Sequence, residues 1–178
     1  MVLGKIKMKI KFSFILIFLL IAFIILIFFK SLFENNKYIP KKTSKIENIF
    51  IEEFYSGNNL KLKELFGNEK FIIINIWASW CVPCRQEHQF INNISKIANS
   101  KVIGLNYKDK INNAQKFLDE LGNPYDIILK DQNGTKSIFL GAYGVPETFI
   151  IDSELNIIKK YIGPLNSENE TEIKKLIK

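Results

Sequence analysis

Two cysteines, Cys81 and Cys84, are the residues of this chain best suited to chemistry. They are the only cysteines among 178 residues, and two residues separate them. Thiols at this spacing can close a small disulfide ring and reopen it without unfolding the surrounding structure. Trp80 precedes the pair, and Val82 and Pro83 lie between the two thiols. The pattern predicts a redox-active dithiol.

The elements on either side of the pair predict different roles for the two thiols. The apolar run from Phe71 to Trp77 predicts a strand covered on both faces, and the amphipathic stretch from Arg85 to Ala98 predicts a helix. Cys81 would then lie at the first turn of that helix, where free N–H groups and the helix dipole stabilise a thiolate. Cys84, one turn further in, would be more covered. We expect Cys81 to attack a partner disulfide and Cys84 to resolve the mixed disulfide.

Other uses of a Cys-x-x-Cys pair fit this sequence less well. A structural disulfide needs no further residues, but the position between a buried strand and a helix favours redox chemistry. Zinc would need two further ligands, and His88 is the only histidine. Covalent haem attachment uses C-x-x-C-H, whereas Arg85 follows Cys84 here. We therefore expect no metal and no cofactor beyond the redox-active Cys81–Cys84 disulfide.

The formal net charge of +7 belongs to the N-terminal part of the chain. Residues 1–45 carry nine lysines and one acid, Glu34, and the rest of the chain is near neutral. The basic character therefore does not indicate a nucleic-acid partner. Phe12 to Phe29 contains no charge, and a helix of this length spans about 27 Å, close to the thickness of a bilayer core. Bulky residues follow the run, so we expect a retained anchor; a cleaved signal peptide is the alternative.

These patterns divide the chain into four parts. We predict a cytoplasmic tail at residues 1–11, a transmembrane anchor at 12–33, a polar linker at 34–47 and one globular domain at 48–178. The short, acid-free tail favours the cytoplasm, although lysines also follow the span, so charge alone does not fix the orientation. The domain would then lie outside, where disulfides are chiefly made and exchanged.

Hydrophobic periodicity in the globular part predicts an alternation of strands and helices. The expected strands are residues 49–54, 71–77, 102–107, 125–129, 148–151 and 157–162, and the expected helices are 85–98, 111–121, 136–140 and a terminal helix around 173–177. Residues 60–66 form a further short element. The order is a right-handed β-α-β unit, an inserted helix and strand, and a β-β-α unit.

This order, together with Gly144-Val145-Pro146-Glu147-Thr148 ahead of a strand, resembles the thioredoxin-like fold: an α/β domain with a central mixed sheet flanked by helices, here with an inserted helix-strand segment. In that fold a cis-proline loop lies beside the disulfide and offers backbone groups to an extended substrate chain. The resemblance implies Val145 and Pro146 as substrate contacts, and a plain turn proline is the alternative. We also expect Trp80, Val82 and Pro83 to contact the substrate.

A narrower resemblance rests on several motifs in the same order. The motifs are Asn75-Ile76-Trp77-Ala78-Ser79-Trp80-Cys81, Cys84-Arg85-Gln86-Glu87-His88-Gln89, Gly104-Leu105-Asn106-Tyr107-Lys108-Asp109, Leu121-Gly122-Asn123-Pro124-Tyr125 and Gly141-Ala142-Tyr143-Gly144-Val145-Pro146-Glu147-Thr148-Phe149-Ile150-Ile151-Asp152. They are similar to the DsbE/CcmG proteins of cytochrome c maturation.

The resemblance implies a thiol-disulfide reductase held at a bacterial inner membrane by a single span, with its C-terminal domain in the periplasm. Its implied electron donor is an inner-membrane thiol carrier. Its implied clients are disulfides of apocytochrome c or of a thiol-reducing maturation partner, which must be reduced before haem can be attached.

Asn75 lies where thioredoxins in general have a buried aspartate that assists proton transfer. A neutral amide cannot accept the proton of Cys84, so we expect Glu147 or Glu87 to contribute. A Glu147 carboxylate beside the disulfide would raise the pKa of the thiols. A solvated position on the helix surface is the alternative for Glu87.

We interpret Arg85 and His88 as surface residues, although His88 follows Cys84 by one helical turn and could influence its titration. Four aromatic residues could line a partner groove, although aromatic residues more often lie in the core: Trp77, Trp80, Tyr107 and Tyr143.

Two other functions remain open. One is a broader periplasmic oxidoreductase or isomerase with another client. The other is a copper-delivery protein of related fold, which would use C-x-x-x-C and a distant histidine, neither of which this chain has.

Overall fold

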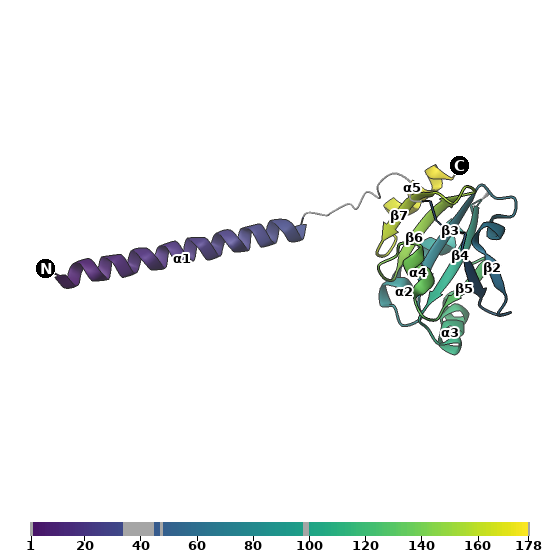
Figure 1. The fold of residues 1–178 in the computed structure, drawn as a ribbon, viewed down its shortest axis with the longest axis horizontal. Helices are drawn as coiled ribbons and strands as arrows, with labels where there is room; N and C mark the ends of the chain where they lie inside the picture. The colour runs from purple at the N-terminus through teal and green to yellow at the C-terminus, as the bar shows by residue number, and fades with distance from the viewer. Residues whose placement is uncertain (1, 34–44, 47, 98–99, 178) are drawn as a thin grey trace. The chain divides into compact units, whose positions relative to one another are not determined.

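The computed structural model of the protein describes residues 2–33, 45–46, 48–97 and 100–177 (Figure 1). Its contacts divide the chain into two units, residues 1–39 and 40–178, which we describe separately. The predicted linker at 34–47 lies outside the described residues except for Lys45 and Ile46. The predicted helix end at Ala98 also lies outside the described residues.

The first unit consists of one long helix, α1 (Val2–Phe33). Its segment Phe12–Lys30 has a mean hydropathy of 3.3 and side chains that no other part of the protein covers. In the part of the chain that the structure describes, this is the one helix that is long and apolar enough to cross a membrane. The predicted tail and the predicted anchor therefore lie on a single continuous helix.

The second unit is built on a sheet of seven strands in the order β2-β1-β5-β4-β3-β6-β7 (Figure 1). The strands are β1 (Phe50–Glu53), β2 (Asn59–Lys61), β3 (Phe71–Trp77), β4 (Ser100–Tyr107), β5 (Ile127–Asp131), β6 (Glu147–Asp152) and β7 (Ile157–Ile162). The central strands β3, β4 and β5 run parallel, and the remaining pairs are antiparallel. This mixed sheet confirms the predicted thioredoxin-like fold.

Helices cover both faces of the sheet. They are the 3-10 helix η1 (Leu62–Phe66), α2 (Val82–Ile94), α3 (Ile111–Leu121), α4 (Thr135–Phe139) and α5 (Ser167–Leu176). Side chains of α2, α3 and α5 join the hydrophobic cluster that contains both cysteines, whereas η1 packs in the cluster on the opposite face. Alternation along β3 explains the division, because Ile73 and Trp77 point to the first face and Ile72, Ile74 and Ile76 point to the second.

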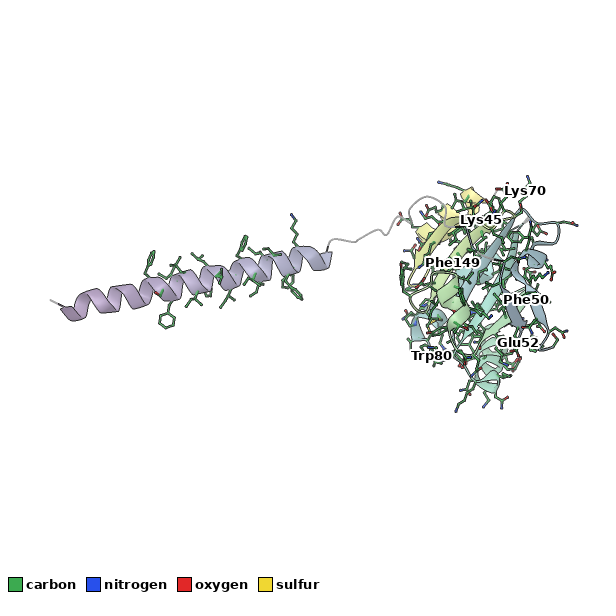
Figure 2. All side chains as sticks on the ribbon, in the orientation of Figure 1. Lys45, Phe50, Glu52, Lys70, Trp80 and Phe149 are labelled. Atoms are coloured by element: carbon green, nitrogen blue, oxygen red, sulfur yellow. A yellow bond between two sulfur atoms is a disulfide. The ribbon has the colours of Figure 1, made fainter. Side chains whose placement is uncertain are left out.

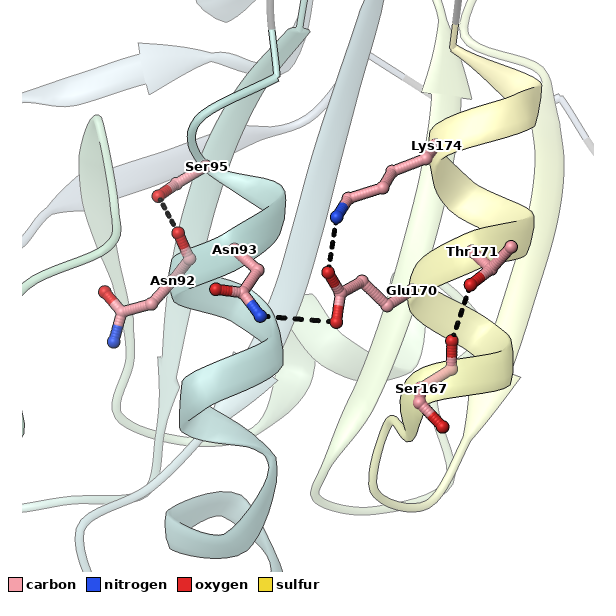
Figure 3. A network of polar contacts seen from close by, with 7 residues as sticks. All are labelled: Asn92, Asn93, Ser95, Ser167, Glu170, Thr171 and Lys174. Carbon is pink, nitrogen blue, oxygen red and sulfur yellow. Dashed lines mark hydrogen bonds and ion pairs between the residues drawn. The ribbon is translucent and has the colours of Figure 1, made fainter.

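Helices α2 and α5 lie side by side on the face of the cysteines (Figure 3). Asn93 of α2 donates to a Glu170 carboxylate oxygen at 3.3 Å, and Lys174 pairs with the other oxygen of Glu170. Figure 2 shows the domain with all its described side chains, and Trp80 lies near the edge of the domain while Phe149 lies over the sheet. The disulfide helix α2 is therefore held from the side as well as by the sheet.

Several predicted boundaries are wrong. Helix α2 begins at Val82 and not at Arg85, β4 begins at Ser100 and not at residue 102, and α5 begins at Ser167, where Asn166 caps it. The helix after the cysteines ends at Ile94, because the chain turns at Ser95, whose N–H still reaches Ile91 O while Ile97 N bonds Ile94 O. The strand expected at 125–129 begins at Ile127, because Asp126 instead accepts a hydrogen bond from Val102 N at 2.7 Å.

Candidate active site

The two cysteines form a disulfide where β3 passes into α2. Their Cα atoms are 5.3 Å apart. Cys81 is the N-cap residue of α2, and its sulfur accepts a hydrogen bond from Cys84 N at 3.1 Å. We expected Cys84 to be more buried than Cys81, but their exposed fractions differ little, since Cys81 is 4% and Cys84 is 2% exposed. The N-terminal position of Cys81 provides the free N–H groups that stabilise a thiolate.

Three of the predicted substrate contacts surround the disulfide at the surface. Trp80 is 56% and Val82 is 68% exposed, and Pro83 is also exposed. The Trp80 indole N–H donates to Lys108 O at 3.1 Å, which fixes the direction of the ring. These side chains border the buried cysteines and are open to a partner chain.

Asp109 holds the loop immediately before the cysteines. Its carboxylate accepts hydrogen bonds from Ser79 N at 2.5 Å and from Ser79 Oγ at 2.8 Å. The same carboxylate accepts from Lys110 N at 2.8 Å and from the Asn106 amide at 3.2 Å. The turn after β4 is thus tied to the approach to Cys81. Sequence reasoning missed this role of Asp109, although its place after a predicted parallel strand was a signal for it.

The loop that contains Pro146 lies against the same hydrophobic cluster as the cysteines. The Val145–Pro146 peptide bond is cis. Val145 packs, half-buried, against the cluster that includes Cys81 and Cys84. Pro146 is buried, and its carbonyl accepts a hydrogen bond from Gly163 N at 3.0 Å. Val145 therefore reaches the cluster that contains the disulfide, and it also packs against the cluster on the opposite face of the sheet.

Glu147 is buried at the start of β6, with 1% of its surface exposed. One carboxylate oxygen accepts hydrogen bonds from Tyr143 N at 2.7 Å and Gly144 N at 2.9 Å. The other lies 2.8 Å from the ammonium of Lys160 in β7. The charge of Glu147, which we expect to raise the pKa of the thiols if it lies beside them, is therefore paired with Lys160. A signal for Lys160 was absent from the sequence, where it reads as one of two consecutive lysines.

A second buried carboxylate, Glu87, lies on α2 one turn after Cys84. Asn75 of β3 donates to Glu87 Oε1 at 2.8 Å, and Leu165 N donates to Glu87 Oε2 at 2.8 Å. The same Asn75 amide group donates to Thr148 Oγ1 at 3.0 Å. The interpretation of Glu87 as a solvated surface residue is therefore wrong, because α2 is covered on this side by the chain at Leu165.

Burial sets the protonation behaviour of this network. It raises the pKa of Glu87 to about 7, and the hydrogen bonds from Leu165 N and Asn75 offset part of the effect. Burial, together with the charge of Glu87, raises the pKa of Tyr125 well above its ordinary range. The Tyr125 hydroxyl therefore keeps its proton and donates to Asn75 Oδ1 at 2.8 Å. Glu87 is left able to accept or release a proton near neutral pH.

His88 is also buried, at 4% exposure, so its interpretation as a surface residue is wrong. Its Nε2 lies 2.9 Å from Gly122 O, and its ring meets Phe117 edge-on. Burial lowers the pKa of His88, which favours the neutral ring. The reason for the error is that α3 covers this side of α2. Arg85 is at the surface as predicted and pairs with Glu120 at 2.8 Å.

The four aromatic residues expected at a partner groove or in the core are divided between core and surface. Trp77 is 1% exposed and stacks on Tyr125 with ring centroids 5.5 Å apart, so it belongs to the core. Tyr143 is 73% exposed, and half-buried Tyr107 lies 6.4 Å from the Trp80 ring. Three of the four aromatic residues are therefore accessible to a partner.

Within the described ranges, no three His, Cys, Asp or Glu side chains gather closely enough to hold a metal ion.

Comparison with known proteins identifies relatives of this chain. The Redoxin family model matches residues 40–177. The thiol:disulfide interchange protein DsbE of Vibrio cholerae is 37% identical over 161 residues, which cover 84% of this chain and 85% of the relative. The DsbE protein of Haemophilus influenzae is 42% identical over 120 residues, 67% of this chain and 66% of the relative.

Solved structures share the fold at lower identity. A DsbF homologue from Corynebacterium diphtheriae superimposes with a TM-score of 0.65 at 20% identity, over 80% of this chain and 95% of that structure. At this identity the likeness concerns the fold alone.

Proposed function

Because the chain belongs to the DsbE/CcmG thiol:disulfide interchange proteins of the Redoxin family, we propose that this thiol-disulfide oxidoreductase acts as a reductase in cytochrome c maturation. The observation that carries the proposal is Glu87, a buried acid one helical turn after Cys84 with a pKa of about 7. A negative carboxylate near the thiols disfavours their thiolates. A less stable reduced form makes a dithiol a better electron donor.

In the proposed reaction the Cys81 thiolate attacks one sulfur of a client disulfide. The client S–S bond breaks and a mixed disulfide forms at Cys81. Cys84 then loses its proton to Glu87, directly or through water, and attacks the Cys81 sulfur. The client leaves with both its sulfurs reduced, and the two electrons come from the Cys81–Cys84 dithiol, which becomes a disulfide. An inner-membrane thiol carrier returns the two electrons.

Glu147 would support this reaction through the loop at Pro146. Its carboxylate bonds the Tyr143 and Gly144 amides, which precede the two proposed client contacts Val145 and Pro146. The client chain would lie along this loop and against Trp80, Val82 and Pro83. The proposed clients are apocytochrome c or its thiol-reducing maturation partner, whose cysteines must be free for haem attachment.

The proposed location is a bacterial inner membrane. Helix α1 would cross it at residues 12–33, with residues 1–11 in the cytoplasm and the domain of residues 48–178 in the periplasm. Support comes from the apolar Phe12–Lys30 segment and from the chemistry of the cysteines, because disulfides are chiefly made and exchanged in oxidising compartments. Protease added to spheroplasts should remove the domain; a protected domain would contradict this orientation.

The test of the client is a trapping experiment in the source cell. In Cys84→Ser the resolving thiol is absent, so the mixed disulfide at Cys81 should accumulate and be recovered under non-reducing conditions. We expect cytochrome c assembly proteins or apocytochrome c in the trapped complexes. The double variant Cys81→Ser/Cys84→Ser is the matched control and should trap nothing. Recovery of unrelated clients alone would support the broader oxidoreductase instead.

A further inference from the structure

Lys160 is a buried lysine for which the reaction above has no use. It lies in β7 and is 8% exposed, with 4% of its side chain accessible. A buried ammonium is costly unless several partners replace its water. The neighbouring Lys159 has the partly exposed position that is usual for a lysine, since its side chain is 38% exposed and pairs with Glu172 at 2.7 Å. The partners of Lys160 therefore indicate what it does.

Three partners of Lys160 lie between Gly141 and Glu147, the segment that contains Pro146. Its ammonium lies 2.8 Å from Glu147 Oε2 and donates to Gly141 O at 2.7 Å. It also lies 4.0 Å from the centre of the Tyr143 ring, a cation–π contact. One cation thus contacts three positions spread along a single seven-residue loop.

Glu147 extends these contacts to the backbone. The oxygen that does not face Lys160 accepts from the Tyr143 and Gly144 amides, at 2.7 and 2.9 Å. Lys160 therefore fixes the carboxylate that in turn fixes the two residues before Val145. By contrast, the loop's outer face is open, since Tyr143 is 73% exposed.

We propose that Lys160 is a positioning residue that holds residues 141–147, and with them the backbone of Val145 and Pro146, in the conformation that receives a client chain. The inference rests on the proposed function in one respect, namely that clients bind along this loop. Lys160 itself does not touch the reacting sulfurs.

The experiment compares three variants of the full chain in detergent. Lys160→Met keeps the length of the side chain and removes the ammonium. Lys160→Met/Glu147→Gln removes both charges, so that no unpaired carboxylate is left buried, while the Gln oxygen can still accept from the two amides. Lys159→Met removes an ion-paired lysine from the adjacent position and is the matched control.

Kinetics with an oxidised synthetic peptide containing a C-x-x-C-H disulfide give the first readout. We expect KM to rise about tenfold in both Lys160 variants with a smaller change in kcat, because the loop binds the client before and during the exchange. Lys159→Met should keep the KM of the wild-type protein. If the only role of Lys160 is to neutralise Glu147, the double variant restores KM, and the proposal is overturned.

Amide hydrogen exchange gives a second readout that needs no client. The Tyr143 and Gly144 amides should exchange about tenfold faster in the double variant than in the wild-type protein, because their acceptor is no longer held in place. Unchanged exchange overturns the proposal. If the wild-type protein does not reduce the peptide, the proposed client class fails, and the exchange rates alone decide the role of Lys160. If Lys160→Met does not fold, both the kinetic and the exchange measurements are made on the double variant.

Discussion

Replacing Glu87 by Gln tests the central feature of the site, the buried acid on the cysteine helix α2. Glutamine has the same shape but cannot ionise. It should retain one of the two hydrogen bonds that Glu87 accepts, from Asn75 and from Leu165 N. Its amide group would face the other donor, and losing that bond costs about 1 kcal/mol at every pH.

The magnitude of the pH-dependent part follows from the raised pKa. The pKa of Glu87 is 4.5 in the unfolded chain and about 7 in the folded protein. Between these values the folded protein holds a proton that the unfolded chain has lost, so the free energy of unfolding falls as pH rises. The total loss is about 3 kcal/mol, complete above about pH 7.

The two contributions have opposite signs, so the stabilities should cross. At about pH 4 Glu87→Gln should be less stable than the wild-type protein by about 1 kcal/mol. At about pH 8 it should be more stable by about 2 kcal/mol, because the wild-type protein then pays for a buried charge. Groups common to both proteins, such as His88, cancel in the difference.

Denaturant unfolding of the oxidised full chain measures this difference. Trp77 is buried against Tyr125, so its fluorescence should report the unfolding of the domain. Curves at several pH values give the free energy of unfolding of each protein. A difference that stays constant between about pH 4 and pH 8 would refute a raised pKa for Glu87. The proton-transfer role assigned to Glu87 would then lose its basis.

Two further predictions concern the surroundings of the site. Gly104→Ala would place a Cβ 2.8 Å from the indole nitrogen of Trp77 and from the ring of Tyr125. It should therefore lower the free energy of unfolding by about 1 to 3 kcal/mol, as measured by the same denaturant curves. An unchanged denaturation midpoint would contradict this packing. Asp109→Ala would leave the Ser79 amide and hydroxyl without their acceptor. It should therefore lower the free energy of unfolding by about 1 to 3 kcal/mol and speed hydrogen exchange at the Ser79 amide. An exchange rate equal to that of the wild-type protein would contradict this role of Asp109.

The fold was predictable because its signals are local and strong. The run from Phe71 to Trp77 is almost entirely apolar and forms one of the three central strands, β3, with the predicted bounds. The cysteines, placed between that strand and a helix, identified the reactive site without any knowledge of its neighbours. The inserted helix has the predicted bounds, and the inserted strand is two residues later than predicted.

What the sequence did not predict is how neighbouring elements surround each side chain. Glu87 and His88 read as polar surface residues of a helix with one apolar stripe. They are buried because α3, at Gly122, and the chain at Leu165 cover α2 on two further sides. The partnership of Lys160 with Glu147 has the same origin, since strand alternation gives the direction of a side chain but not its partner across the sheet.

The hydrogen bonds around Asn75 and Glu87 also bear on when the protein becomes active. They join residues that are 12, 50, 73 and 78 positions apart in the chain. A chain that is made from its N-terminus cannot form the last of them before Leu165 has been added and the sheet has closed. Until then Glu87 is solvated and titrates like any exposed glutamate. The dithiol is present early, but the environment that raises the pKa of Glu87 is a product of the finished fold. If Glu87 accepts the proton of Cys84 as proposed, incomplete chains should exchange thiols more slowly than the folded protein.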